Sequence, residues 1–225
     1  MNNIKWNFEN KQCLIVGGSR GIGKCIVDNF KNAGANVFSI DSSNCNISNP
    51  KEIDLLISKF TKVDILVNVA AINYCKKIND ITLEEWDNVF DVNLRGIFYI
   101  TKKVLKLMSS GSRIVNVSSI AGRNRSLVSG VHYTSSKAGI IGFTRQLAFE
   151  LGPKSINVNA VCPSQTLTEM LKQSMSAEQI ARLSESIPLK RIASVQEQVD
   201  PILFLCSSES SYITGAVLDV NGGQL

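Results

Sequence analysis

The stretch VGGSRGIG, residues 16–23, joins a short apolar run to a helical pattern. The run KQCLIVGG, residues 11–18, predicts a buried strand that ends in glycines. Residues 21–35, GIGKCIVDNFKNAGA, then repeat apolar side chains at helical spacing and stop at Gly34. Glycines in a strand-to-helix turn allow a tight backbone turn and the close approach of a pyrophosphate to the helix N-terminus. The stretch therefore predicts a nucleotide site, although a glycine turn by itself also serves merely to connect two elements.

Strand and helix patterns alternate along the rest of the chain. Further strands are predicted at residues 36–41, 62–70, 112–119, 155–163 and 216–223, and helices at 48–60, 82–108, 131–151 and 198–207. Three helix starts carry capping signals, namely Asn49 before Pro50, Thr82 with Glu85, and Ser194 with Glu197. Such alternation is typical of an α/β protein whose parallel sheet is covered by helices on both faces. Residues 1–225 are therefore predicted to form a single Rossmann-type domain with a doubly wound parallel sheet of about seven strands.

The composition limits the classes of function. The chain has 225 residues, of which 44% are hydrophobic, a formal net charge of +5 and a pI of about 8.9. Its Lys and Arg are scattered rather than gathered in a stripe, so we expect no nucleic acid as partner. No apolar stretch reaches membrane-spanning length and the first residues lack the apolar segment of a signal peptide, so we expect no membrane partner. Six dispersed cysteines and a single histidine predict no metal site and a reduced, cytoplasmic protein.

The segment VHYTSSKAGI, residues 131–140, places Tyr133 and Lys137 four positions apart, and therefore on one face of the predicted helix. A free tyrosine has a pKa near 10, and lowering that pKa by about three units requires roughly 4 kcal/mol. One ammonium about 4 Å away supplies roughly that much at an effective dielectric constant near 20. The pair is thus suited to proton exchange at about pH 7–8. Taken alone, the same spacing also fits a surface Tyr and Lys on an amphipathic helix.

Asp41 ends the second predicted strand, roughly 20 residues after the glycine stretch. A carboxylate at this place can accept hydrogen bonds from ribose hydroxyls. The alternative is an ordinary turn residue before Ser42.

Two potentially reactive residues lie next to these motifs. His132, the only histidine, adjoins Tyr133, and Cys162 precedes Pro163. Neighbouring helix positions point in different directions, so His132 is predicted to be a packing or rim residue. Cys162 is predicted to be a small buried residue rather than a nucleophile.

From residue 12 to residue 223 the sequence resembles the short-chain dehydrogenases/reductases, in a branch like the 3-oxoacyl reductases and sugar dehydrogenases. The glycine pattern of that family appears as VGGSRGIG, its NNAG motif as NVAA at residues 68–71, and its YxxxK motif in full. The segments DVNLRG, NVSSIAG, PSQTLT and YITGAVLDVNGG follow the family's further motifs in the expected order. One such motif is weakly specific, whereas all of them in order are strongly so.

The resemblance implies a role for each matching residue. Tyr133 is expected to be the general acid/base, and Lys137 to tune it and to hold the nicotinamide ribose. Ser119 is expected to polarise the substrate oxygen, and Asn93 to hold a proton-relaying water chain. The expected cofactor-binding residues are Gly17, Ser19, Arg20, Gly21, Ile22, Gly23, Asp41, Asn46, Ile47, Asn68, Ala70, Tyr133, Lys137, Pro163, Thr166 and Thr168.

The sequence departs from the family pattern at two places. Asp41 leads directly into SSNCNISNP, so the helix that usually follows the second strand is expected to be absent, with CNIS, residues 45–48, as the end of a short third strand. Asn46 stands where an Asp often contacts adenine, and an amide can both accept and donate there. Val16 and Val69 replace polar residues of the family, and we expect their side chains to meet across neighbouring strands.

Together these residues predict an oxidoreductase that transfers a hydride between a nicotinamide cofactor and a carbonyl or secondary alcohol. Alternatives are a 3-oxoacyl reductase-type activity and a non-catalytic dinucleotide-binding sensor, but a sensor predicts loss of Ser119, Tyr133 or Lys137. An enoyl reductase of the same superfamily needs a longer Tyr-to-Lys spacing. The mixed character of the segment after Pro163 favours a small polar substrate such as a sugar, polyol or hydroxy acid.

Two residues give opposite indications of which cofactor is preferred. Asp41 repels a 2′-phosphate and favours NAD(H), whereas Arg20 favours NADP(H), which stays possible. Because Ser42 rather than a basic residue follows Asp41, NAD(H) is predicted to be preferred. Separately, surplus apolar residues on the two longest helices, Phe98 and Phe149 among them, predict a homo-oligomer and most simply a tetramer.

Overall fold

The computed structural model describes residues 6–126, 128–169, 171 and 176–224. These residues form a parallel sheet of six strands in the order β2–β1–β3–β4–β5–β6. The strands are β1 (Gln12–Val16), β2 (Asn36–Ile40), β3 (Ile65–Asn68), β4 (Arg113–Val117), β5 (Asn157–Pro163) and β6 (Val217–Val220). The α-helices of the described residues are α1 (Gly21–Asn32), α2 (Pro50–Ile57), α3 (Leu83–Phe90), α4 (Ile97–Val104), α5 (Ile120–Arg123), α6 (Val131–Leu151), α8 (Ala177–Glu185) and α9 (Val195–Cys206). The predicted α/β class with a parallel Rossmann-type sheet is confirmed.

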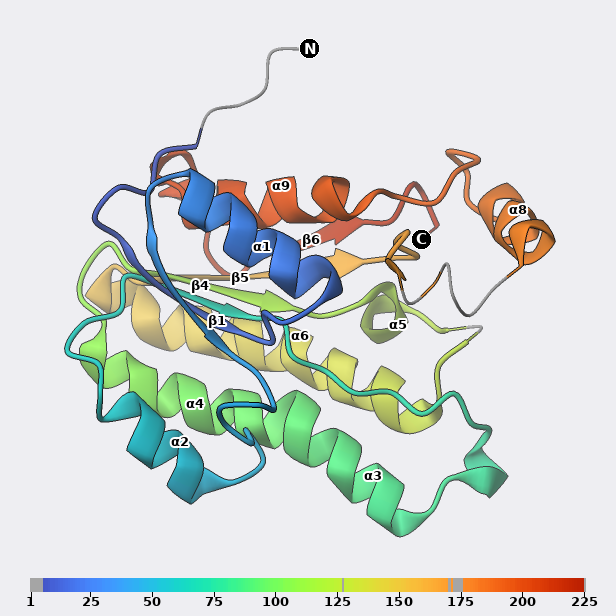
Figure 1. Cartoon of the computed structure of the whole chain (residues 1–225), viewed down its shortest axis with the longest axis horizontal. Helices are drawn as coiled ribbons and strands as arrows, with labels where there is room; N and C mark the ends of the chain where they lie inside the picture. Colours follow the sequence, from blue (N-terminus) through green and yellow to red (C-terminus); the bar gives the residue numbers. More distant parts are fainter. Residues whose placement is uncertain (1–5, 127, 170, 172–175, 225) are drawn as a thin grey trace.

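Helices cover both faces of the sheet, as predicted (Figure 1). Helices α1 and α9 lie on one face, over a core cluster that includes Ile15, Phe30 and Leu203. Helices α2, α4 and α6 lie on the other, over a second cluster that includes Leu14 and Ile114. Alternate residues of each strand contribute to the two clusters, because side chains of a strand alternate between the faces of its sheet.

The strand count differs from the prediction at one edge. Residues 45–48 (CNIS) form turns and irregular structure rather than a third strand, so β2 is the edge of the six-stranded sheet. The backbone N–H groups of Asn44 and Cys45 donate to the Asp41 carbonyl, and that of Asn49 donates to the Asn46 carbonyl. These donors are used within turns and are therefore not available for pairing with β2. The expected absence of a helix directly after β2 is confirmed.

The hypothesis that Val16 and Val69 meet is wrong. Their backbones are neighbours, since the Val69 N–H donates to the Val16 carbonyl at 2.9 Å. Val16 is paired with Asn68, however, and the residue after Asn68 points to the opposite face of the sheet. Val16 accordingly packs in the cluster under α4 and α6, and Val69 in the cluster under α1 and α9.

The capping signals are confirmed. Asn49 accepts a hydrogen bond from the Lys51 N–H, and reciprocal capping boxes start α3 at Thr82 and α9 at Ser194. The helix predicted over residues 82–108 is divided in the structure. Between α3 and α4 runs a π-helical turn, η2 (Asp91–Gly96), and a 3₁₀ turn, η3 (Leu105–Leu107), follows α4. Extra-residue turns of this kind are frequent at functional sites, and Asn93 lies within this one.

The order of the strands reverses beside β1, which places a topological switch point at their carboxyl ends. Helix α1 leads from β1 to β2 on one side, and the chain returns through α2 to β3 on the other side of β1. Ligands of open α/β sheets bind where neighbouring connections diverge in this way. Among the described residues, no helix combines the length and the apolarity that crossing a bilayer requires.

Candidate active site

The glycine turn after β1 is built from close backbone approaches. Gly17 has φ of +101°, and a methyl group placed on it would lie 2.5 Å from the Ala70 nitrogen. A methyl group on Gly23 would lie 1.9 Å from the Gly17 carbonyl oxygen. Any side chain at either position collides with backbone, so the turn requires glycine at both. The sequence prediction of a tight turn at these residues is confirmed.

Helix α1 starts at this turn with its first donors free of competing acidic groups. Arg20 is the N-cap residue, its side chain makes no capping hydrogen bond, and the first turn of α1 holds no acidic residue. Gly21 and Ile22 are half-buried there, whereas Ser19 and Arg20 are exposed. The N-terminal N–H groups of a twelve-residue helix attract an anion. These residues fit the pyrophosphate of a dinucleotide.

The segment after β5 approaches the same turn. Strand β5 ends at Pro163, and a methyl group on Gly21 would lie 3.5 Å from the Thr168 Cγ2 atom. The Thr166 hydroxyl donates to the Ser164 carbonyl at 2.9 Å, and the Thr168 hydroxyl accepts from the Leu171 N–H at 3.3 Å. The structure therefore brings two predicted cofactor-binding segments together, although they are more than a hundred residues apart in the sequence.

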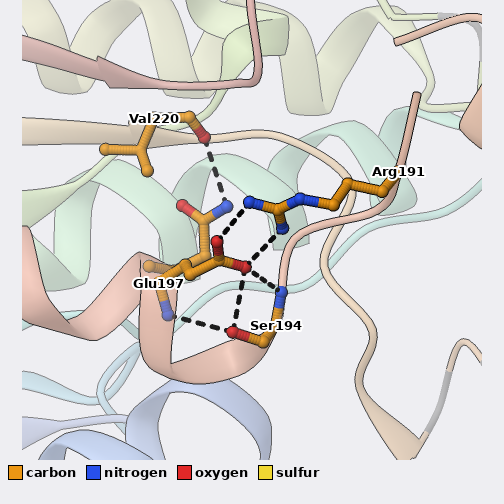
Figure 2. A network of polar contacts seen from close by, with 5 residues as sticks. Arg191, Ser194, Glu197 and Val220 are labelled. Atoms are coloured by element: carbon orange, nitrogen blue, oxygen red, sulfur yellow. Dashed lines mark hydrogen bonds and ion pairs between the residues drawn. The ribbon is translucent and has the colours of Figure 1, made fainter. Parts of the chain in front are cut away.

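An ion pair holds the segment after β5 in place. Arg191 and Glu197 face each other, with Ser194 beside them (Figure 2). The Arg191 guanidinium, followed by the Ser194 N–H, lowers the pKa of Glu197 to about 2. Through this pair α9 fixes the strand-like stretch at Ala193, whose carbonyl accepts from the Leu167 N–H at 2.8 Å. The capping box at Ser194 was visible in the sequence, but the contribution of Arg191 was not.

Asp41 lies at the carboxyl end of β2, where a ribose would be expected. Its carboxylate accepts from the Ser43 N–H at 2.9 Å and from the Ser43 hydroxyl, and these bonds lower the pKa of Asp41. Asp41 is therefore ionised at neutral pH. Asn46 and Ile47 follow, with the Asn46 side-chain oxygen accepting from Ser48 and Ile47 buried in the core.

Asn68 belongs to a buried polar network at the carboxyl end of β3. Its amide nitrogen donates to the Asn116 side-chain oxygen at 2.8 Å and to the Thr101 hydroxyl at 3.2 Å. The Asn116 amide in turn donates to the Thr144 hydroxyl at 2.9 Å. The Asn68 oxygen is buried and has no partner among the described residues. Asn68 could be predicted from the sequence but the rest of this network could not, because its members become neighbours only when β3, β4, α4 and α6 pack together.

Tyr133, Lys137 and Ser119 converge at the carboxyl end of β4. Helix α6 presents Tyr133 and Lys137 on one face, and Ser119 is the N-cap of α5, directly after β4. The Ser119 side chain lies close enough to the Tyr133 hydroxyl to lower the pKa of the tyrosine. Helices α5 and α6 lie in direct contact, since a methyl group on Gly122 would lie 2.5 Å from the Lys137 carbonyl carbon. The predicted trio is therefore a geometric cluster.

Burial dominates the acid–base properties of this trio. It raises the pKa of Tyr133, an effect that the neighbouring Ser119 side chain opposes. It also lowers the pKa of Lys137 to about 8. Lys137 is not among the groups that shift the pKa of Tyr133 in the cofactor-free chain, so the predicted lowering by the lysine is not seen there. Lys137 is only 2% exposed, and its ammonium donates to the Val117 carbonyl at 2.8 Å and lies 5.7 Å from the centre of the Tyr133 ring.

Asn93 is fully buried in the π-helical turn and clamps the segment after β3. Its side-chain oxygen accepts from the Ile72 N–H at 2.8 Å, and its amide nitrogen donates to the Ile72 carbonyl at 2.9 Å. The amide also donates to the Ser136 hydroxyl at 3.1 Å, which ties the turn to α6. Asn93 thus connects the strand end at β3 to the helix that carries Tyr133.

Two further contacts at the site escaped sequence analysis. The Ser118 hydroxyl donates to the Lys137 carbonyl at 2.7 Å, which fixes α6 to the end of β4. Arg123 of α5 forms a two-pronged ion pair with Asp219 of β6, which holds the short helix capped by Ser119. Cys162 lies buried nearby with a raised pKa, chiefly because of burial, in agreement with its predicted packing role. Among the described residues, no group of His, Cys, Asp and Glu is arranged to hold a metal ion.

Comparison with known proteins yields one family. Residues 39–224 match the family model described as Enoyl-(Acyl carrier protein) reductase. The chain is 35% identical over 244 residues to the 3-oxoacyl-[acyl-carrier-protein] reductase of Aquifex aeolicus, an alignment that covers 96% of this chain and 98% of the relative.

Three solved structures share the fold along nearly their whole length. The aldohexose dehydrogenase of Thermoplasma acidophilum has a TM-score of 0.87 at 29% identity, covering 96% of this chain and 94% of that one. The 3-oxoacyl-[acyl-carrier protein] reductase of Brucella melitensis has a TM-score of 0.89 at 29% identity, with 100% and 98% covered. A short-chain dehydrogenase of Leptospira borgpetersenii with bound NAD+ has a TM-score of 0.87 at 29% identity, with 100% and 96% covered.

A glycine turn at the switch point of a parallel sheet, with a Ser–Tyr–Lys cluster opposite it, defines an oxidoreductase of the dinucleotide-binding class. The chain belongs to the short-chain dehydrogenase/reductase family and is an NAD(P)-dependent enzyme of that family.

Proposed function

We propose that residues 1–225 act as one domain that transfers a hydride between a nicotinamide cofactor and a carbonyl or secondary alcohol, with Tyr133 as general acid/base. The observation that carries this proposal is the position of the Ser119 side chain beside Tyr133, whose pKa it lowers, with Lys137 one helical turn away. Ser119 follows the carboxyl end of β4, and ligands of open α/β sheets bind at the carboxyl ends of the strands.

The cofactor would be held by residues of five segments. The start of α1, from Ser19 to Gly23, would receive the pyrophosphate, and Asp41 the adenosine ribose. Asn68, at the carboxyl end of β3, and Ala70 would flank the middle of the cofactor. Asn46 and Ile47 would flank its adenine. Pro163, Thr166 and Thr168 would enclose the nicotinamide side, together with Tyr133 and Lys137 at its ribose. When bound, the cofactor supplies or accepts the hydride at the substrate carbon.

The chain itself handles the proton and the substrate oxygen. In the reductive direction the Tyr133 hydroxyl donates its proton to the substrate oxygen, and the Ser119 hydroxyl polarises the same oxygen by a hydrogen bond. The raised pKa of Tyr133 keeps its hydroxyl protonated at neutral pH, as a donor must be. Lys137, with a pKa of about 8, can release and regain a proton close to physiological pH. Asn93 keeps the segment after β3 at the site and is proposed to hold the water chain that restores the tyrosine proton.

The substrate class best supported is a 3-oxoacyl thioester. The curated relatives that align along the whole chain are 3-oxoacyl-[acyl-carrier-protein] reductases. A polyhydroxy aldehyde is the second candidate, favoured by the likeness to an aldohexose dehydrogenase and by the mixed segment after Pro163. The sugar substrate favoured by the sequence therefore takes second place, because the relatives do not specifically support a sugar as substrate.

A substrate panel with both cofactors distinguishes these candidates. The full-length protein would be assayed with a short 3-oxoacyl-coenzyme A thioester, aldohexoses and polyols. We expect kcat/KM for the thioester to exceed that for any sugar by about tenfold or more, an energy difference of about 1.4 kcal/mol. A higher kcat/KM for an aldohexose would favour the second candidate, and no turnover with any carbonyl or alcohol would refute the enzymatic proposal.

We also propose that NAD(H) is preferred and that the enzyme acts in the cytoplasm as a homo-oligomer. The ionised Asp41 at the end of β2 supports NAD(H), since a 2′-phosphate would meet its charge. Apolar side chains left exposed on α4 and α6, with Phe98 at 46% and Phe149 at 81%, support association through these helices.

A further inference from the structure

The start of α6 lacks an ordinary cap. Gly130 is the N-cap residue and has no side chain to accept a hydrogen bond. The first backbone N–H groups of a helix have no partner within the helix, so an uncapped start leaves them unsatisfied. Here the Tyr133 N–H, third in the helix, donates instead to the Nδ1 atom of His132 at 2.7 Å. A side chain within the first turn has taken over the role of the missing cap.

We propose that His132 is a positioning residue for Tyr133, and that its Nδ1 lone pair fixes the turn from which the tyrosine projects. The proposal rests on the function assigned above to Tyr133, since that is the residue positioned. Nδ1 can accept only when it carries no proton, so the ring must be neutral with its proton on Nε2. Uptake of a second proton removes the lone pair and turns Nδ1 into a donor that faces another donor.

The surroundings leave the ring little freedom to adopt another arrangement. His132 is 0% exposed, and its buried Nε2 atom has no partner among the residues that the structure describes. Its ring centre lies 5.9 Å from that of Tyr74, whose hydroxyl accepts from the Asn88 amide at 2.8 Å. A methyl group on Gly130 would lie 2.5 Å from the imidazole Cε1 atom, so the glycine provides the space that the ring occupies. Tyr74 and Gly130 therefore both pack against the imidazole.

Charged and titratable groups approach the ring from other segments. The Glu85 carboxylate of α3 interacts electrostatically with His132 and is paired with Lys76. Tyr74 packs against the ring, and Tyr133 follows His132 in α6. A second proton on the ring would remove the acceptor of the Tyr133 N–H, so we expect turnover to fall where the imidazole is protonated.

The sole histidine of the chain makes the tautomer directly measurable. In the full-length protein labelled with 15N at histidine and tyrosine, the one imidazole gives two nitrogen signals and the Tyr133 amide can be followed beside them. We expect Nδ1 to be unprotonated and Nε2 protonated at neutral pH, and the Tyr133 amide to shift with the same midpoint as the ring when the pH is lowered. A protonated Nδ1 at neutral pH, or a Tyr133 amide that ignores the titration, would overturn the proposal whether or not the enzyme is active.

Two variants separate hydrogen bonding from packing. His132→Leu keeps bulk but removes the acceptor, and we expect kcat to fall by on the order of ten- to a hundredfold, with cofactor affinity nearly unchanged. His132→Asn keeps an acceptor near the Nδ1 position without titrating, and we expect kcat within about threefold of wild type and no decline at the pH where wild type loses activity. Val131→Ala, an exposed neighbour in the same turn, is the control and should behave as wild type.

The other outcomes count against the proposal. A leucine variant with wild-type kcat and an unchanged pH profile would show that the acceptor is dispensable. An asparagine variant as impaired as the leucine variant would show that only the ring's bulk matters. If these variants are normal while Tyr133→Phe is inactive, the proposed function stands and the role of His132 falls. If Tyr133→Phe is active, the proposed function falls, and the nitrogen signals still test the cap.

Discussion

The ammonium of Lys137 lies 5.7 Å from the centre of the Tyr133 ring and directs its hydrogen bond to a main-chain carbonyl, that of Val117. The hydrogen bond of the ammonium is thus made to the main chain at the end of β4. Burial lowers the pKa of Lys137 to about 8 and raises that of Tyr133. In the chain by itself the tyrosine is poised as a proton donor and the lysine as a group that changes charge near neutral pH.

The buried lysine predicts a specific dependence of stability on pH. Its pKa falls from 10.5 in the unfolded chain to about 8 in the folded one, so the unfolded chain binds more protons between these values. The free energy of unfolding should consequently rise with pH across this window, by up to about 3 kcal/mol from this group. In Lys137→Met this contribution is missing. Denaturant unfolding of the two cofactor-free proteins at several pH values should show an advantage of the variant that is largest below pH 8 and shrinks toward pH 10.5. A constant difference across the window would contradict the assignment.

The glycine turn predicts a severe effect of one methyl group. Gly23→Ala places its Cβ 1.9 Å from the Gly17 carbonyl oxygen, so the turn must shift and the start of α1 with it. We expect binding of either nicotinamide cofactor to weaken by about a hundredfold or more, as for a displaced binding group. Lys24→Ala, the next residue and an exposed one, is the control and should change affinity by less than about threefold. Equal affinities of the two variants in a fluorescence titration would argue against the turn as the pyrophosphate site.

Asp41 should set the choice between the two cofactors. Wild type is expected to favour NAD(H) over NADP(H) by about tenfold in kcat/KM, or about 1.4 kcal/mol. Asp41→Ala removes the charge that a 2′-phosphate would meet and should reduce this ratio. Arg20→Ala provides the comparison, since it should weaken use of NADP(H) selectively. A wild-type preference for NADP(H), or a ratio that the Asp41 variant leaves unchanged, would show that Arg20 decides the choice.

The exposed apolar side chains on α4 and α6 predict association. Light scattering at micromolar concentration should give a mass that is a multiple of 24.6 kDa, and most simply four times that value. Phe149→Glu places a charge on the 81% exposed position and should shift the protein toward smaller species. A wild-type mass equal to one chain would exclude the oligomer.

The parts of the site that depend on local spacing could be predicted from the sequence. Gly17 and Gly23 follow from turn geometry, and Tyr133 and Lys137 from helical periodicity. Contacts that arise only from packing could not be predicted from the sequence, and they alter the acid–base properties of the site. The Val117 carbonyl takes the lysine's hydrogen bond because β4 and α6 pack together, which no spacing rule contains.

Two other differences have simple physical origins. The strand predicted to end at residues 45–48 does not form, because the turns after Asp41 use backbone donors that a strand would need. The side chains of Val16 and Val69 do not meet because they point to opposite faces of the sheet. An explicit alignment of β1 with β3 would have revealed this. The division of the helix over residues 82–108 by a π-helical turn around Asn93 has no counterpart in the apolar pattern of that segment.

The most direct test of the enzymatic proposal is the turnover of Tyr133→Phe with the best substrate of the panel. This variant keeps the ring and removes only the hydroxyl that would hold the transferred proton. We expect kcat to fall by at least about a hundredfold, as for loss of general acid catalysis, while the cofactor still binds. Tyr212→Phe, which alters a fully exposed tyrosine, is the matched control and should keep wild-type activity. A Tyr133→Phe enzyme with kcat within about threefold of wild type would contradict the central assignment.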